Sequence, residues 1–317
     1  MDPELFSGTP FLADPLSGWM YWPVMLLFTT LPIEAAAKSL LFLQGLLAGV
    51  GLYALARVLG IQRLGALAGA VAYSYSGFYY IRNLCCLPYA NVYAWTPLVL
   101  AGVELSLRSR SRLERAAWLG GGGFALSQVL AGWVGQGSYY ALLVLGGYVF
   151  YRTVVSPPTA GRSVRERATA LLLTGAGVLL FGFALGAAAL LPRLEFNAIS
   201  NLAQGYSSPS GGWAVRAWAS LADYEGRYYA GASVLTLAIV APFVVGRRHA
   251  APYWLALCAT TLVPGQGPTP LHTLLYNVLP RFESLHAHGP ERVILFFFWV
   301  RRCSPAQRSA GSRLGLE

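Results

Sequence analysis

Residues 7–15 read Ser-Gly-Thr-Pro-Phe-Leu-Ala-Asp-Pro, and residues 19–23 read Trp-Met-Tyr-Trp-Pro. Glycine and proline predict that the first run is a turn-rich loop, and this loop carries the carboxylate of Asp14. Tryptophan and tyrosine, which dominate the second run, settle at the boundary between membrane and water. The two runs together predict a loop just outside a bilayer, with a carboxylate close to the bilayer surface.

The composition excludes an ordinary soluble domain. Of the 317 residues, 56% are hydrophobic and only 11% are charged, and the mean hydropathy is +0.51. Soluble domains carry charge on about a quarter of their residues. The net charge of +10 does not indicate nucleic-acid binding, because the basic residues fall in short breaks between apolar runs. We therefore expect an all-α, polytopic integral membrane protein and no nucleic-acid partner.

The apolar runs predict about eight transmembrane helices and a partial ninth. Residues 19–31 are short and interrupted by proline, so we expect an interfacial helix there. Pro97 falls inside the third span, where neighbouring helices must satisfy the carbonyl group that it frees. The predicted spans are residues 36–56, 64–80, 91–107, 116–134, 139–151, 168–191, 229–245 and 252–263, with the partial helix at 293–300.

We predict one membrane domain over residues 1–300, with outer loops at 1–35, 192–228 and 264–291, and a disordered polar tail at 301–317. The turns at 57–63, 108–115, 152–168 and 246–249 hold 12 arginines, which indicates the cytoplasmic side. This assignment places the N-terminal loop and nine of the 13 acidic residues outside. Polar chemistry is therefore expected on the outer face.

Several short motifs resemble the YfhO-type bacterial membrane proteins over about residues 6–300. They are the Gly-Thr-Pro-Phe-Leu-Ala-Asp-Pro run at 8–15, Ala131-Gly132 with Gln136 and Tyr139-Tyr140, Leu191-Pro192 with Glu195, and Pro290-Glu291-Arg292 before an apolar run. That family is similar to the GT-C glycosyltransferases. The resemblance implies a bacterial inner-membrane enzyme that transfers a sugar from a polyprenyl-phosphate donor to an envelope acceptor on the outer face.

The sequence also departs from that family. Family members have a helix before the Gly-Thr-Pro segment and further spans after the ninth, so we expect a chain truncated at both ends, which could be inactive. His288 stands where the family has an arginine before its Pro-x-Arg element. In members of that family, the loop after the helix that precedes the Gly-Thr-Pro segment carries an acidic residue that is thought to be catalytic.

Glycosyl transfer from a lipid phosphate needs a carboxylate that takes the acceptor proton and groups that stabilise the departing phosphate. Asp14 is the candidate catalytic base; the alternative is that it caps a turn before Pro15. Arg292 could bind the lipid phosphate or anchor the helix to headgroups in general. The remaining candidates for substrate binding are Arg193 and Glu195, which could instead pair with each other, and Asp223 and Glu225, which could instead lie in a solvated loop.

The cofactor requirement stays open, and a divalent metal is compatible with this chemistry. We expect no metal site at His286 and His288 with Glu283 and His272, because this spacing lacks the helical i, i+4 geometry. The four glycines at 120–123 predict close helix packing. The cysteines, two of them adjacent and none in a CxxC pair, are expected to be packing residues.

Two other functions compete with glycosyl transfer. A transporter or flippase for a lipid-linked precursor would place ionisable groups near the bilayer midplane, whereas Lys38 and Glu104 lie near span ends. A non-catalytic membrane protein is the third reading. The sequence leaves the sugar, the acceptor and the oligomeric state open.

Overall fold

The computed structural model describes residues 11–14, 17–76, 87–158, 163–199, 250–262, 274 and 277–279, and the regular structure in this part of the chain is helical. This confirms the all-α prediction for these residues. The elements are α1 (Trp22–Thr30), α2 (Ile33–Val58), α3 (Arg63–Ser74), α5 (Leu87–Arg108), α6 (Arg112–Gly132), α7 (Gln136–Phe150), the π-helical turn η1 (Tyr151–Val155), α8 (Val164–Ile199) and α11 (Ala251–Leu262).

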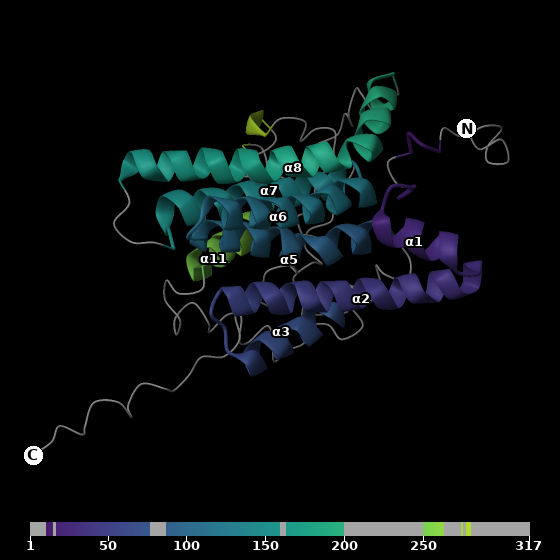
Figure 1. Cartoon of the computed structure of the whole chain (residues 1–317), viewed down its shortest axis with the longest axis horizontal. Helices are drawn as coiled ribbons and strands as arrows, with labels where there is room; N and C mark the ends of the chain where they lie inside the picture. The colour runs from purple at the N-terminus through teal and green to yellow at the C-terminus, as the bar shows by residue number, and fades with distance from the viewer. Residues whose placement is uncertain are drawn as a thin grey trace, which may run out of the picture.

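The long helices form a bundle whose members run along the longest axis of the molecule (Figure 1). Helices α5, α6 and α7 lie between α2 on one side and α8 on the other, and α3 packs on the outside of α2. Helix α11 packs on α7, where the hydroxyl of Tyr253 donates a hydrogen bond of 2.7 Å to the carbonyl oxygen of Val144. The N-terminal segment and α1 lie at one end of the bundle.

The chain reverses direction from α2 to α3, from α5 to α6 and from α7 to α8 at the opposite end, which we call the arginine end. We call the other the N-terminal end. Lys38 and Arg193 are the described basic residues at the N-terminal end. The arginine end holds Arg57, Arg63, Arg108, Arg110, Arg112, Arg115, Arg152, Arg165 and Arg167.

Two of the described helices, α2 and α8, are long and apolar enough to cross a membrane. Large apolar side chains on both point away from the bundle, for example Phe42, which is 71% exposed, and Leu180, which is 70% exposed. Only 22% of the most apolar window of α8 is buried. An apolar helix surface of this kind is typical of a membrane span or of a covered interface.

Two spans are fewer than the eight that we predicted. The described helices α5 and α6 have 22 and 21 residues, which is enough length but with a less apolar sequence. Helices α3 and α11 have 12 residues each, so as straight helices they are shorter than a bilayer is thick. The predicted spans at 229–245 and 293–300, the loop at 264–291 except for a few residues, and the tail at 301–317 lie outside the described residues.

The proline inside α5 is accommodated as the sequence predicts. Pro97 has no N–H group, so the carbonyl oxygen of Tyr93, four residues earlier, loses its helical partner. The hydroxyl of Tyr73 on α3 donates a hydrogen bond of 2.8 Å to this carbonyl oxygen, and the bond is buried. A neighbouring helix thus satisfies the freed carbonyl group, which ties α3 to α5.

Half of the glycine run at 120–123 forms a packing face. A Cβ atom on Gly102 of α5 would lie 2.7 Å from the Cα atom of Gly122, so the two backbones touch. A Cβ atom on Gly123 would lie 2.3 Å from the Cβ atom of Phe181 on α8. Gly120 and Gly121 have open space beside them. Helix α6 therefore meets α5 and α8 through Gly122 and Gly123, the last two glycines of this run.

One predicted boundary is wrong. We expected an outer loop to begin at Pro192, but α8 continues through this proline to Ile199. The ribbon of α8 changes direction toward its C-terminal end, as helices commonly do at a proline (Figure 1). Proline removes one helical hydrogen bond, and the contacts of the next residue, Arg193, hold the last turns in place.

Candidate functional site

Arg193 lies at the centre of a polar cluster at the N-terminal end. Its side chain is only 2% exposed. The Nη1 atom donates a hydrogen bond of 3.0 Å to the carbonyl oxygen of Ala131, in the last turn of α6, and the Nη2 atom donates one of 3.1 Å to the hydroxyl oxygen of Ser17. A guanidinium group at a helix C-terminus satisfies free carbonyl groups and interacts favourably with the helix dipole. Arg193 therefore joins α8, α6 and the N-terminal segment.

The same contact brings Asp14 to this cluster. The backbone N–H and the hydroxyl of Ser17 both donate to the carbonyl oxygen of Asp14, at 3.3 and 3.0 Å, and close a tight turn. The half-buried carboxylate of Asp14 interacts electrostatically with the guanidinium group of Arg193. Two predicted site residues that are far apart in the sequence are thus neighbours in space.

The N-terminal segment is fixed at two further points. The backbone N–H of Trp22 donates a hydrogen bond of 2.8 Å to the side-chain oxygen of Gln128 on α6. The indole N–H of Trp95 on α5 donates one of 2.9 Å to the hydroxyl oxygen of Tyr21. Burial raises the pKa of the Tyr21 phenol, and the bond from Trp95 opposes this rise. The turn that carries Asp14 is therefore anchored to α5, α6 and α8.

Gln44 of α2 and Asn91 of α5 complete what we call the N-terminal polar cluster: Asp14, Ser17, Gln44, Asn91, Gln128 and Arg193. The side-chain amide of Gln44 donates to the side-chain oxygen of Asn91, and both residues are buried. Sequence reasoning missed Ser17, Gln44, Asn91 and Gln128 as site residues. Isolated polar residues inside apolar spans were the available signal for three of them.

Of the other predicted site residues, Glu195 lies in the described part of the chain, and it does not join this cluster. Glu195 is exposed and does not pair with Arg193, so the predicted alternative of an ion pair between them is wrong. The two side chains diverge because Arg193 turns inward to the carbonyl groups of α6. Asp223, Glu225 and Arg292 lie outside the described residues, as do Glu283, His272, His286 and His288.

A second buried charge cluster lies at the arginine end. Glu104 of α5 is 0% exposed. Its carboxylate accepts hydrogen bonds from Arg152 at 2.6 and 2.8 Å, from Arg108 at 2.8 Å and from the hydroxyl of Tyr148 at 2.9 Å. Such a saturated carboxylate has little capacity for a ligand. This cluster joins α5, α7 and η1 and has a structural role.

The described residues contain no group of three or more histidine, cysteine, aspartate or glutamate side chains that could hold a metal ion. No protein-family model, curated protein or solved structure matches the chain. The resemblance to YfhO-type proteins therefore stays a prediction.

Proposed function

We propose that the chain is a polytopic protein of the bacterial inner membrane, with its N-terminal loop outside, that transfers a sugar from a polyprenyl-phosphate donor to an envelope acceptor. The exposed apolar surfaces of α2 and α8 support a membrane location. The concentration of described arginines at one end of the bundle supports the orientation, because such residues stay in the cytoplasm. In this orientation the arginine end lies on the cytoplasmic side and the N-terminal end lies on the outer side.

The observation that carries this proposal is the proximity of Asp14 and Arg193. The turn that holds Asp14 is bonded to Arg193 through Ser17, and the segment behind it is bonded to Gln128. A catalytic carboxylate must be held in a defined position relative to its substrate, which such an anchored turn provides. In this proposal Asp14 is the catalytic base, and Arg193 is a positioning residue.

The reaction balances with these groups. The acceptor hydroxyl oxygen bonds to C1 of the sugar, the bond between C1 and the phosphate oxygen breaks, and polyprenyl phosphate leaves with both electrons of that bond. The proton of the acceptor hydroxyl moves to the Asp14 carboxylate. The YfhO-like motifs support this reaction class, because that family is similar to the GT-C glycosyltransferases, and Arg292 is proposed to meet the lipid phosphate.

The test uses the full chain in proteoliposomes with a labelled polyprenyl-phosphate sugar. We expect transfer by the wild type and a rate lowered by about 10²- to 10⁴-fold in Asp14→Asn, because a general base contributes about that factor. Glu34→Gln is the matched control, since Glu34 is an exposed acid at the same end of the bundle.

Each negative outcome has a defined meaning. No transfer by the wild type would refute the proposed glycosyltransferase activity. Undiminished transfer by Asp14→Asn would refute the role of Asp14 as the catalytic base. Movement of the labelled donor across the membrane without transfer would identify the flippase instead.

A further inference from the structure

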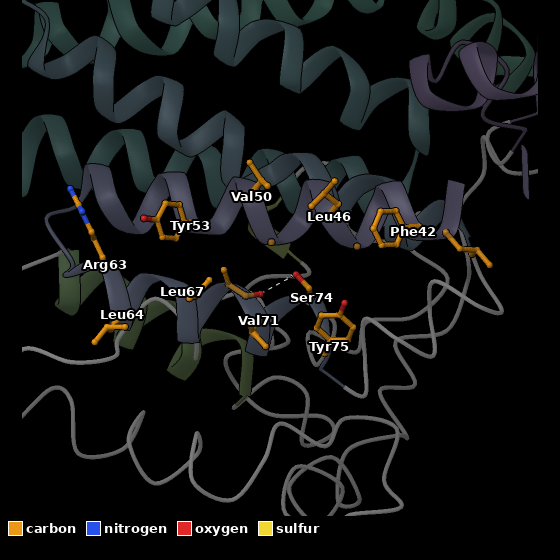
Figure 2. Close-up of a pocket in the computed structure, with 14 residues that line it drawn as sticks. Phe42, Leu46, Val50, Tyr53, Arg63, Leu64, Leu67, Val71, Ser74 and Tyr75 are labelled. Carbon is orange, nitrogen blue, oxygen red and sulfur yellow. Dashed lines mark hydrogen bonds between the residues drawn. The ribbon is translucent and has the colours of Figure 1, made fainter. Parts of the chain in front are cut away.

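Helices α2 and α3 leave an apolar groove of about 660 Å³ between them (Figure 2). Its walls are large apolar side chains that are half exposed or more, including Phe42, Leu46 and Val50 on α2 and Leu67 and Val71 on α3. A water-soluble protein would not keep such a surface bare. In a membrane, a groove of this kind accommodates hydrocarbon.

Two glycines of α2, one helical turn apart, lie at the bottom of the groove; there is free space beside the first, while α3 packs closely against the second. A Cβ atom on Gly45 would meet nothing within 4 Å. A Cβ atom on Gly49 would lie 2.5 Å from the hydroxyl oxygen of Ser74 across the groove. Gly45 therefore leaves free volume in the groove, while Gly49 lets α3 approach α2.

One end of the groove carries a cation. Arg63, the first residue of α3, lies beside the groove next to Tyr53, while Phe42 and Tyr75 lie at its other end (Figure 2). Arg63 is exposed and makes no hydrogen bond or ion pair with the described residues. Arg57 fixes the turn before it, because its Nη1 atom donates a hydrogen bond of 2.6 Å to the carbonyl oxygen of Ile61. The backbone that leads into Arg63 is thus fixed at this corner, while its exposed guanidinium group makes no bond to the described residues.

The dimensions suit one leaflet of a bilayer. Helix α3 has 12 residues and is therefore about 18 Å long. Half of the hydrocarbon core of a bilayer is about 15 Å thick. A chain that lies along the groove with its polar group at Arg63 would therefore span one leaflet.

We propose that the α2–α3 groove binds one acyl chain of an anionic phospholipid whose headgroup pairs with Arg63. The apolar walls fit the chain, and the positive charge of Arg63, the arginine that lines the groove, complements a negative headgroup. With the proposed orientation this lipid belongs to the cytoplasmic leaflet. The inference requires a membrane location but not sugar transfer, so the two proposals can fail separately.

Native mass spectrometry of the purified full chain, titrated with phosphatidylglycerol or phosphatidylcholine, tests this site. We expect the wild type to bind phosphatidylglycerol about fivefold more tightly, which is the contribution of one basic residue near a membrane surface. Arg63→Gln is expected to abolish the preference and keep the binding of phosphatidylcholine. Gly45→Leu fills the groove and is expected to weaken the binding of both lipids about tenfold, as overfilled apolar sites do.

Gly121→Leu is the matched control, because Gly121 is exposed on α6 and also has nothing within 4 Å of a new Cβ atom. Equal affinity of the wild type for both lipids, or equal affinities of Gly45→Leu and Gly121→Leu, would overturn the proposal. A dimer that Gly45→Leu disrupts would assign the groove to a second copy and overturn it as well. Arg63→Gln changes an exposed side chain, so the headgroup test holds even if Gly45→Leu does not fold.

Discussion

Among the described residues, Arg193 makes hydrogen bonds that reach far along the chain, since it bonds to Ser17 and to the last turn of α6. We expect Arg193→Ala to destabilise the protein by about 3 kcal/mol, because it leaves buried carbonyl and hydroxyl groups without donors and creates a cavity. Arg193→Lys is expected to lose less, since an ammonium group keeps the charge but not the forked geometry. Thermal unfolding in detergent measures both.

Glu195→Ala is the control for this pair, because Glu195 is exposed and two residues away. Its effect is expected to stay within about 0.5 kcal/mol. Equal melting temperatures of Arg193→Ala and Glu195→Ala would show that the buried guanidinium group does not hold the cluster together.

At the arginine end, the carboxylate of Glu104 is a buried charge. Glu104→Gln removes the charge that faces Arg108 and Arg152, and breaking a buried ion pair in this way costs about 3–5 kcal/mol. Glu114→Gln is the control, since Glu114 is exposed in the first turn of α6 and its side chain accepts a hydrogen bond from the backbone N–H of Arg110, which a glutamine side chain can also accept. A melting temperature that falls equally in both variants would contradict the structural role of Glu104.

At the residue scale, the sequence singled out Asp14 and Arg193 as candidates, which the structure places close together, but not their partners. The loop motif around Asp14 and the position of Arg193 after Pro192 were visible as local patterns. The partner of Arg193 was not, because Ser17 lies 176 positions away and no local spacing encodes that contact. Gln128 was missed for the same reason: its acceptor atom matters only once Trp22 is placed beside it.

At the scale of elements, the hydrogen bond between Tyr73 and Tyr93 links two helices. Tyr73→Phe leaves a buried carbonyl group without a donor and is expected to cost about 1–3 kcal/mol. In a Pro97→Ala background residue 97 regains its N–H group, so the same change should cost much less. A double-mutant cycle on thermal stability measures this coupling.

The control for the cycle is Tyr75→Phe, since Tyr75 is 74% exposed. Additive effects of Tyr73→Phe and Pro97→Ala would mean that the hydroxyl does not compensate for the proline.

The apolar runs predicted most described helices to within a few residues. The predicted spans at 36–56 and 91–107 fall inside α2 and α5, and the span at 116–134 overlaps α6 but runs two residues past its end. The end of α8 was wrong because we read Pro192 as a helix stop. A proline costs one hydrogen bond, and this loss is outweighed where the next residue is bonded to two distant segments, which a local reading does not detect.

At the scale of the whole molecule, the separation of arginines from the N-terminal segment predicts a labelling pattern. In a background without the four native cysteines, Arg110→Cys should react with an impermeant maleimide only from the cytoplasmic side. Leu12→Cys should react only from the outside, since Leu12 is exposed and its carbonyl oxygen accepts a hydrogen bond from the indole of Trp19, just before α1 at the N-terminal end. Reaction of both sites from one side would contradict the proposed orientation.

The contact between Gly102 and Gly122 has a mechanical consequence for α5 and α6. Because backbone meets backbone there, sliding one helix along the other forces atoms together, whereas pivoting disturbs few neighbours. The contact therefore acts as a fixed pivot between the two helices. Any change in their crossing angle moves Gln128 and Arg115, which lie on α6 on opposite sides of this contact, in opposite directions relative to α5.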